Sequence, residues 1–127
     1  MDSSSTVPFN SDTVQEYLRG LTKRLRYDVE TTFAKAELCA SDEDVVVAAV
    51  SVWTVLCEQL NAAPPKFFEI LQWRETFLGM FDQETPVVLE AIPDEAERAA
   101  AAAQFAERRE QIVQCFYRFE AVASQVK

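Results

Sequence analysis

The chain has 127 residues, of which 49% are hydrophobic, and carries a net charge of −9 with no histidine and only two glycines. This length and composition fit one folded domain with its own core. The missing histidine and the scarcity of glycine argue against the commonest catalytic sites and phosphate-binding loops, and the acidic balance argues against binding of nucleic acids or anionic membranes.

The first ten residues are polar and contain a proline, so we expect residues 1–10 to form a flexible tail before a single domain at 11–127. They lack the basic and apolar segments of a secretory signal. The longest apolar run, at 45–57, covers about 13 residues and is too short to cross a bilayer. We therefore expect a cytoplasmic protein that does not enter a membrane.

Three cysteines, Cys39, Cys57 and Cys115, are odd in number and far apart in the sequence. That pattern favours buried free thiols in a reducing compartment over a disulfide or a metal site. Carboxylate metal centres in helical bundles also need Glu-x-x-His pairs, which a chain without histidine cannot supply. We expect no cofactor, no metal and no small-molecule substrate.

A first helix is predicted to begin near Ser11 or Asp12, where Thr13 and Glu16 also have the spacing of a capping box. Apolar side chains then recur at steps of three and four along one stripe of about six turns. The stripe consists of Val14, Tyr17, Leu18, Leu21, Leu25, Val29 and Phe33. The helix can continue to Cys39.

A second helix is predicted from Ser41, a hydroxyl cap followed by three acids that suit the positive end of the helix dipole. From 45 to 57 only Ser51 and Thr54 are polar, so this helix is expected to occupy the middle of the bundle. The three valines at 45–47 also suit a strand. Helix is preferred because the cap precedes them and no second strand is available for pairing.

A third helix is predicted over about 65–81, because a proline at its first turn is favourable. At 100° per residue, one face carries Phe67, Ile70, Leu71, Phe77, Leu78 and Phe81. Arg74 falls at the centre of this apolar face. Trp73 and Met80 widen the face on one side, and Phe68 stands alone on the opposite flank.

Residues 75–97 contain seven acids and no base. With prolines at 86 and 93, this stretch is predicted to be a connector with one short turn at 86–91. A carboxylate-only site of Glu90, Glu95 and Glu97 is the remaining option for catalysis, although acids in such a linker are normally solvated. An enzyme is therefore not expected.

The last helix is predicted to run from Glu95 to Val126, with Asp94 and Glu97 in capping positions. Five consecutive alanines at 99–103 permit close approach of another backbone. The second half carries a heptad seam. Its members are Phe105, Arg109, Ile112, Phe116, Phe119, Ala123 and Val126.

Arg74 is the most unusual residue, because a guanidinium inside an apolar stripe needs a carboxylate or carbonyl partner. The carboxylate could come from Asp82, from Glu84 or from another chain. Alternatively, the side chain lies over the edge of the core and extends its head to solvent.

Arg19, Lys23 and Arg26 share one helical face, with Arg24 beside it. This basic patch could bind an acidic partner segment or another anion, pair with residues 75–97, or remain solvated.

Apolar surface on more than one side of the third helix suggests an oligomer seam or a partner groove, although a four-helix core could absorb it. The residues assigned to partner binding are Phe68, Trp73, Arg74, Met80, Arg19, Lys23 and Arg26. The partner would be another protein or a second copy of the chain.

A short pattern near the end of the second helix resembles a known family. Thr-Val-Leu at 54–56 is followed by Pro-Pro at 64–65, and Arg109 and Ile112 lie on a later helix. This pattern resembles RbcX-type Rubisco assembly chaperones, small helical proteins that dimerise and hold a client peptide in a groove. The stretch where that family carries tyrosine is here 45–52, which contains none.

These observations predict an all-α antiparallel bundle of about four principal helices, with long first and last helices. The expected function is a non-enzymatic protein–protein interaction module, such as an adaptor, scaffold or complex subunit, that self-associates. The alternative is an assembly chaperone that holds a client peptide between the second and third helices.

Overall fold

The computed structural model describes residues 11–35 and 38–125, so the predicted tail at 1–10 lies outside the described residues. The described chain forms four helices and no strand. The helices are α1 (Asp12–Phe33), α2 (Ala40–Leu60), α3 (Phe67–Glu90) and α4 (Glu95–Ser124). The predicted all-α, four-helix bundle is therefore confirmed. Over the same residues, no helix combines the length and the hydropathy that a membrane span requires.

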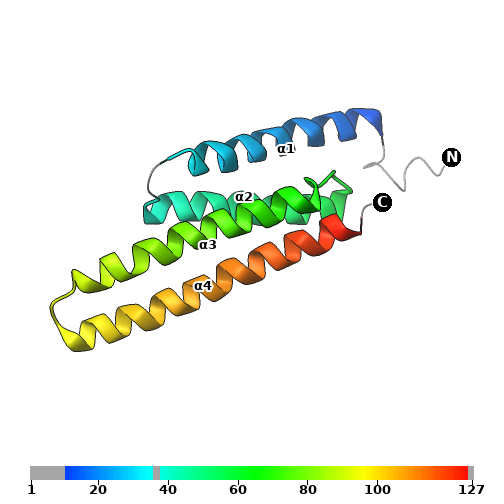
Figure 1. Ribbon diagram of the computed structural model, residues 1–127. Coiled ribbons are helices and arrows are strands. Elements are labelled where there is room, and N and C mark those ends of the chain that lie inside the picture. The colour runs from blue at the N-terminus through cyan, green and yellow to red at the C-terminus, as the bar shows by residue number, and fades with distance from the viewer. Residues whose placement is uncertain (1–10, 36–37, 126–127) are drawn as a thin grey trace.

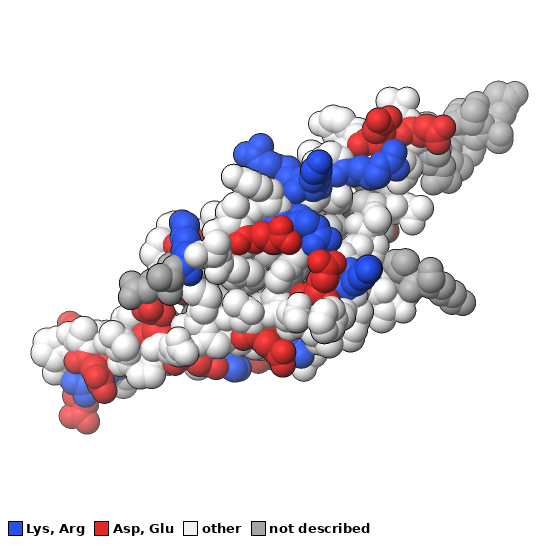
Figure 2. Space-filling view, turned by 45° about the horizontal axis from the view of Figure 1, so that its top comes forward, with Lys and Arg blue, Asp and Glu red and all other residues white. Residues whose placement is uncertain are grey.

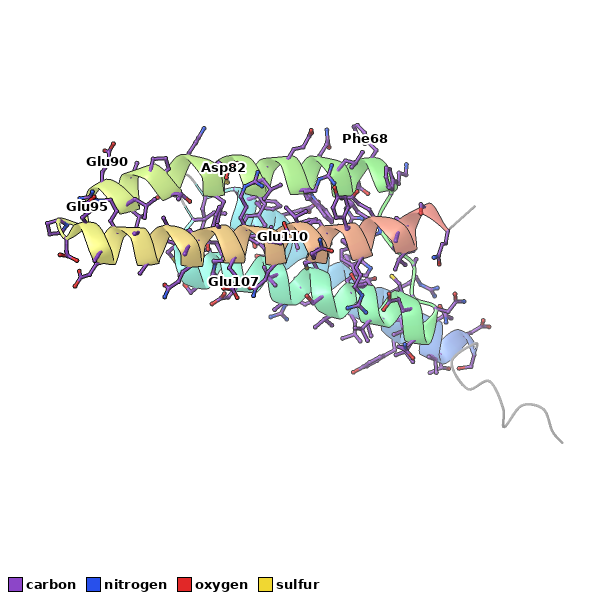
Figure 3. All side chains as sticks on the ribbon, turned by 90° about the horizontal axis from the view of Figure 1, so that it is seen from below. Phe68, Asp82, Glu90, Glu95, Glu107 and Glu110 are labelled. Carbon is purple, nitrogen blue, oxygen red and sulfur yellow. The ribbon has the colours of Figure 1, made fainter. Side chains whose placement is uncertain are left out.

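The helices alternate in direction, as Figure 1 shows. α1 packs against α2, α2 against α4, and α4 against α3. In Figure 3, α2 and α3 lie at opposite edges of the bundle with α4 between them. The turn between α3 and α4 extends past the end of the α1–α2 pair (Figure 1), so part of this hairpin has no helix from the other pair beside it.

Aromatic rings fill the centre of the bundle. Phe77 of α3 contacts Phe33 of α1 and Phe116 of α4, with ring centroids 6.0 and 6.1 Å apart. Trp53 of α2 meets Phe119 at 5.4 Å, and its indole nitrogen donates a hydrogen bond of 2.9 Å to the carbonyl of Ala63. Because this bond satisfies the indole N–H, Trp53 can be buried without leaving an unpaired polar group.

The ends of α1 and α2 differ from the predictions. α1 ends at Phe33 rather than continuing to Cys39, and the N-cap of α2 is Cys39 rather than Ser41. The backbone N–H of Cys39 donates to the Asp42 carboxylate at 3.1 Å, and that carboxylate also binds Lys35 at 2.5 Å. An acid can accept from the N-cap only when it lies three residues further on. Asp42 therefore sets the start of α2 at Ala40.

The helix α2 ends before the prolines. Asn61, with φ of 60°, adopts the left-handed conformation that closes many helices, and the N–H of Ala62 bonds the carbonyl of Leu56 at 3.1 Å. The following helix begins at Phe67 rather than at Pro65, because the N–H of Lys66 is capped by the Glu69 carboxylate at 3.2 Å. The prolines thus belong to an extended link.

The predicted connector at 75–97 is wrong over most of its length, because α3 continues through Pro86 to Glu90. Contacts with α4 support this continuation: Phe81 meets Phe105 at 6.2 Å, and Asp82 binds Arg109 through hydrogen bonds of 2.8 and 3.0 Å. These tertiary contacts outweigh the local penalty of one proline.

Two predicted faces are only partly correct. The seam of α4 is confirmed at Ile112, Phe116, Phe119 and Ala123, which are all buried. On α1, Leu18 and Val29 are buried as predicted; Tyr17, however, is 69% exposed, and Leu21 is exposed too. Phe67, assigned to the apolar face of the third helix, is 42% exposed. Val126 lies outside the described residues.

Candidate protein-binding surface

Arg26 belongs to a partly buried cluster that joins three helices. Its guanidinium lies 5.6 Å from the Trp53 ring centroid and 5.5 Å from that of Trp73. It donates to the Glu69 carboxylate at 2.7 and 3.3 Å, and Glu30 lies 3.6 Å away. The hydrogen bonds between Arg26 and Glu69 raise the pKa of the guanidinium and lower the pKa of the carboxyl. Arg26 is thus paired with Glu69 and Glu30, and not with the acids of residues 75–97 that the sequence offered as one possibility.

Arg74 pairs with Glu120 of α4, and not with Asp82 or Glu84, the two acids of its own chain that were considered as possible partners. One guanidinium nitrogen lies 2.9 Å from Oε2 of Glu120 and donates to Oε1 at 3.2 Å. The guanidinium also lies 5.5 Å from the Tyr117 ring centroid. The carboxylate is buried, and this burial raises the pKa of Glu120. Arg74 is therefore paired within the chain, between α3 and α4.

The remaining predicted site residues are dispersed. Trp73 is only 9% exposed and Met80 is partly buried against the core, as expected for the alternative in which the four-helix core absorbs this apolar surface. Phe68 is 64% exposed, and Figure 3 shows it pointing away from the bundle near the start of α3. Arg19 and Lys23 are exposed, and Figure 2 shows basic side chains gathered along α1. No common surface unites the seven residues.

An apolar face that the sequence analysis did not predict lies on α2. At 100° per residue, the positions 41, 45, 48, 52, 55 and 59 fall within a sector of about 80°, opposite the buried Val46, Val50 and Trp53. We call this sector the α2 face. It consists of Ser41, Val45, Ala48, Val52, Val55 and Gln59, and all six residues are exposed. Its three valines are 43%, 49% and 44% exposed.

The α2 face is free of charge, and the four acids of α2 are paired with three basic side chains. The chain has a net charge of −9, yet each of the four acidic residues of α2 is bound by a lysine or an arginine. The pairs are Asp42 with Lys35, Glu43 and Asp44 with Arg108, and Glu58 with Arg118. A partner that covers the α2 face therefore meets little of the protein's excess negative charge.

The sequence contained a signal for this face. A helix that is apolar all round was predicted to lie in the middle of the bundle, and that prediction is wrong. In a bundle of four helices each helix turns one side outward, so a helix of this kind must either expose apolar residues or meet a partner. The spacing alone does not show which residues these are, because the buried Val46, Val50 and Trp53 recur at the same steps of three and four as the exposed row.

The cavities of the described structure are small or shallow. One of about 330 Å³ lies where the loop before α2 meets α3 and α4, and Leu38, Phe81 and Phe105 contribute apolar walls. A shallow groove of about 630 Å³ runs between α1 and α3, beside Phe33 and Trp73. The first could receive one or two apolar side chains, whereas the second is open to solvent.

The groups with chemical reactivity are scattered. Glu90 and Glu95 lie at the far end of the α3–α4 hairpin (Figure 3), and Glu97 is exposed near them. Within residues 11–35 and 38–125, no three histidine, cysteine or acidic side chains are arranged to hold a metal ion. Cys39 is exposed, so the prediction of a buried thiol is wrong there, whereas burial raises the pKa of Cys57 to about 11.

Comparisons of the chain with protein-family models, with curated proteins and with solved structures found no match.

Proposed function

We propose that this protein is a non-enzymatic helical interaction module, an adaptor, scaffold or complex subunit, that binds another protein helix through the α2 face. The single observation that supports this function is the exposed, uncharged row of Val45, Ala48, Val52 and Val55. Exposed apolar surface that is continuous along one element is typical of protein contacts, whereas single exposed apolar residues are ordinary.

The spacing of the row favours a helical partner. Steps of three and four keep the side chains on one line along α2, and a partner helix can place its own side chains between them. From Ser41 to Gln59 this line is about 27 Å long, at about 1.5 Å per residue. A partner segment of about five turns would therefore cover it.

The alternative function, a chaperone with a client groove between α2 and α3, has less support. The rings of Trp53 and Trp73 meet at 6.1 Å between these two helices and occupy the space that such a groove requires. The cavity of about 330 Å³ at the other end of the bundle could accept only a short part of a client. Phe105 lines this cavity. If an added peptide slowed amide hydrogen exchange around Phe105, the result would support the chaperone function instead.

The test is site-specific photo-cross-linking in the cell of origin. A photoreactive residue replaces Val52 in one variant and Val87 in a matched control, since Val87 is also an exposed valine, 65% exposed, but lies on α3 away from the α2 face. We expect protein adducts of defined mass from position 52 and not from position 87. Adducts of the same kind from both positions, or none from position 52, would contradict the proposal.

A further inference from the structure

The proposed function leaves the partner open, and the following inference rests on it. We infer that the partner is a second copy of this chain, whose α2 packs antiparallel on the α2 face about a two-fold axis that passes beside position 50. Three observations support this arrangement: the order of residues along the face, the pairing of the charges beside it, and the size of its side chains.

The residues of the α2 face are arranged symmetrically about position 50. Ser41 and Gln59 are equally far from it, as are Val45 and Val55, and as are Ala48 and Val52. When two copies meet antiparallel with this point on the two-fold axis, each apolar residue lies opposite an apolar one and each polar residue opposite a polar one. A contact of this kind uses the same patch on both subunits, which is the property of a two-fold interface.

The charges also permit self-contact. Two chains with a net charge of −9 repel one another, so a stable contact must form where the local charge is small. Beside the α2 face, Asp44 is bound by Arg108 at 2.8 Å and Glu58 by Arg118 at 2.6 Å. In the antiparallel arrangement Asp44 lies near position 56 of the second copy, which is a leucine. Asp42 lies level with Glu58 of the second copy, but both acids lie outside the α2 face and are bound by Lys35 and Arg118 of their own chains.

The side chains are small enough for close packing. Ala48 faces Val52 of the other copy near the axis, and such pairs allow two helices to approach to about 8–10 Å. A single pair of helices of about 27 Å buries an area at the low end of specific interfaces. We therefore expect a reversible dimer with a Kd on the order of 10 µM.

Disulfide cross-linking tests the geometry. In a background with Cys39→Ser, Cys57→Ala and Cys115→Ala, the variants Val45→Cys and Val55→Cys are prepared separately and then mixed under mild oxidation. Position 45 of one copy lies opposite position 55 of the other. The two copies of position 45, and likewise the two copies of position 55, lie about 15 Å apart along the helix, beyond the reach of a disulfide. We expect covalent dimers from the mixture and almost none from either variant alone.

The association itself is measured on the purified, unmodified chain by sedimentation from about 1 to about 100 µM. We expect Val52→Glu to weaken dimerisation at least tenfold, because two new carboxylates then lie near the axis. The matched control Val87→Glu adds the same charge outside the face and should weaken it less than twofold. Circular dichroism verifies that both variants keep the helical fold. Added salt, from about 50 to about 500 mM, should strengthen dimerisation, because it screens the repulsion between two acidic chains.

Three other outcomes would overturn the inference, and each has a different meaning. Cross-linking of either variant with itself would show a parallel pair. A dimer that Val52→Glu leaves intact would place the interface elsewhere. A monomer at every concentration would exclude the second copy, while adducts from position 52 in cells would still support the proposed function with a different partner.

Discussion

The side chains of Arg26 and Glu69 tie α1 to α3 through two hydrogen bonds of 2.7 and 3.3 Å, beside the rings of Trp53 and Trp73. A planar guanidinium can bind a carboxylate with two donors and lie against an aromatic ring at the same time, which a lysine ammonium cannot do equally well. This cluster links α1 to α3, and its members Glu30 and Trp73 also line the shallow groove between these two helices.

The first prediction concerns that cluster. Arg26→Ala should destabilise the protein by about 1–2 kcal/mol, because it removes a bidentate ion pair and the contacts with two indole rings. Arg26→Lys should recover only part of this loss. The control is Lys23→Ala on the same helix, where the exposed side chain should change stability by less than about 0.5 kcal/mol. The measurement is denaturant unfolding followed by tryptophan fluorescence, and equal effects of the two alanine substitutions would refute the prediction.

The second prediction concerns Arg74 and Glu120. Arg74→Leu leaves the buried Glu120 carboxylate without its cation and should cost about 2 kcal/mol at pH 7, less than for a fully buried pair because Arg74 is partly exposed. The double variant Arg74→Leu, Glu120→Leu should recover most of the loss. Thermal unfolding of the single and double variants provides the measurement. A double variant no more stable than Arg74→Leu would show that the ion pair does not explain the cost.

The cost of Arg74→Leu should also depend on pH. Burial raises the pKa of Glu120 in the folded protein, and the charge of Arg74 opposes this rise, so removal of Arg74 should raise the pKa further. A carboxyl group with a raised pKa favours the folded state at low pH, and that contribution is lost as pH rises through the folded pKa. The destabilisation by Arg74→Leu should therefore shrink between pH 7 and pH 5. A constant difference in free energy across this range would contradict the pKa argument.

The third prediction concerns Pro86, which lies inside α3. A proline has no backbone N–H, so the helical hydrogen bond to the carbonyl of Asp82 cannot form. Pro86→Ala should stabilise the protein by about 1 kcal/mol, less than at a central helical position because α3 ends at Glu90. Thermal unfolding measures the effect, with Val87→Ala as the neighbouring control. A loss of stability would contradict this prediction. It would show that the packing of the Pro86 ring on α4 stabilises the protein more than the missing backbone hydrogen bond destabilises it.

The fourth prediction concerns thiol reactivity. Cys39 is exposed, whereas burial raises the pKa of Cys57 to about 11 and also raises the pKa of Cys115. The thiolate is the reactive form, so at pH 8 iodoacetamide should modify Cys39 first and leave the other two largely intact until the protein unfolds. Peptide mapping by mass spectrometry follows the three sites, with urea-unfolded protein as the control. Modification of Cys57 as fast as Cys39 in the native protein would contradict the assigned burial.

Local physical chemistry was sufficient to predict the helices themselves. The periodic apolar side chains of residues 14–33 and of the α4 seam determine which elements form, because an amphipathic helix is stable only with that face buried. The antiparallel order follows from the short links between the helices. Helix ends were predicted less well. At the start of α2, for example, Cys39 and Asp42 form the cap that the sequence suggested for Ser41.

Tertiary structure decided the length of α3 and the partners of the charged residues. Helix propensity predicts a break near Pro86, but packing against Phe105 and the ion pair with Arg109 carry α3 onward to Glu90. Likewise, the partner of Arg74 is a glutamate 46 residues away in the sequence. Pairings over such a separation depend on how the helices are rotated and aligned, which local periodicity does not specify.

The α2 face also depends partly on the sequence and partly on the tertiary structure. The sequence alone determined that α2 is apolar all round, since nearly every residue from 45 to 57 is hydrophobic. Only the tertiary structure decided which side remains outside, because the positions of α1 and α4 cover Val46 and Val50 and leave Val45, Val52 and Val55 exposed. Burial is a property of the assembled helices, and a helix with apolar residues on every side gives no internal sign of which of them the neighbouring helices will cover.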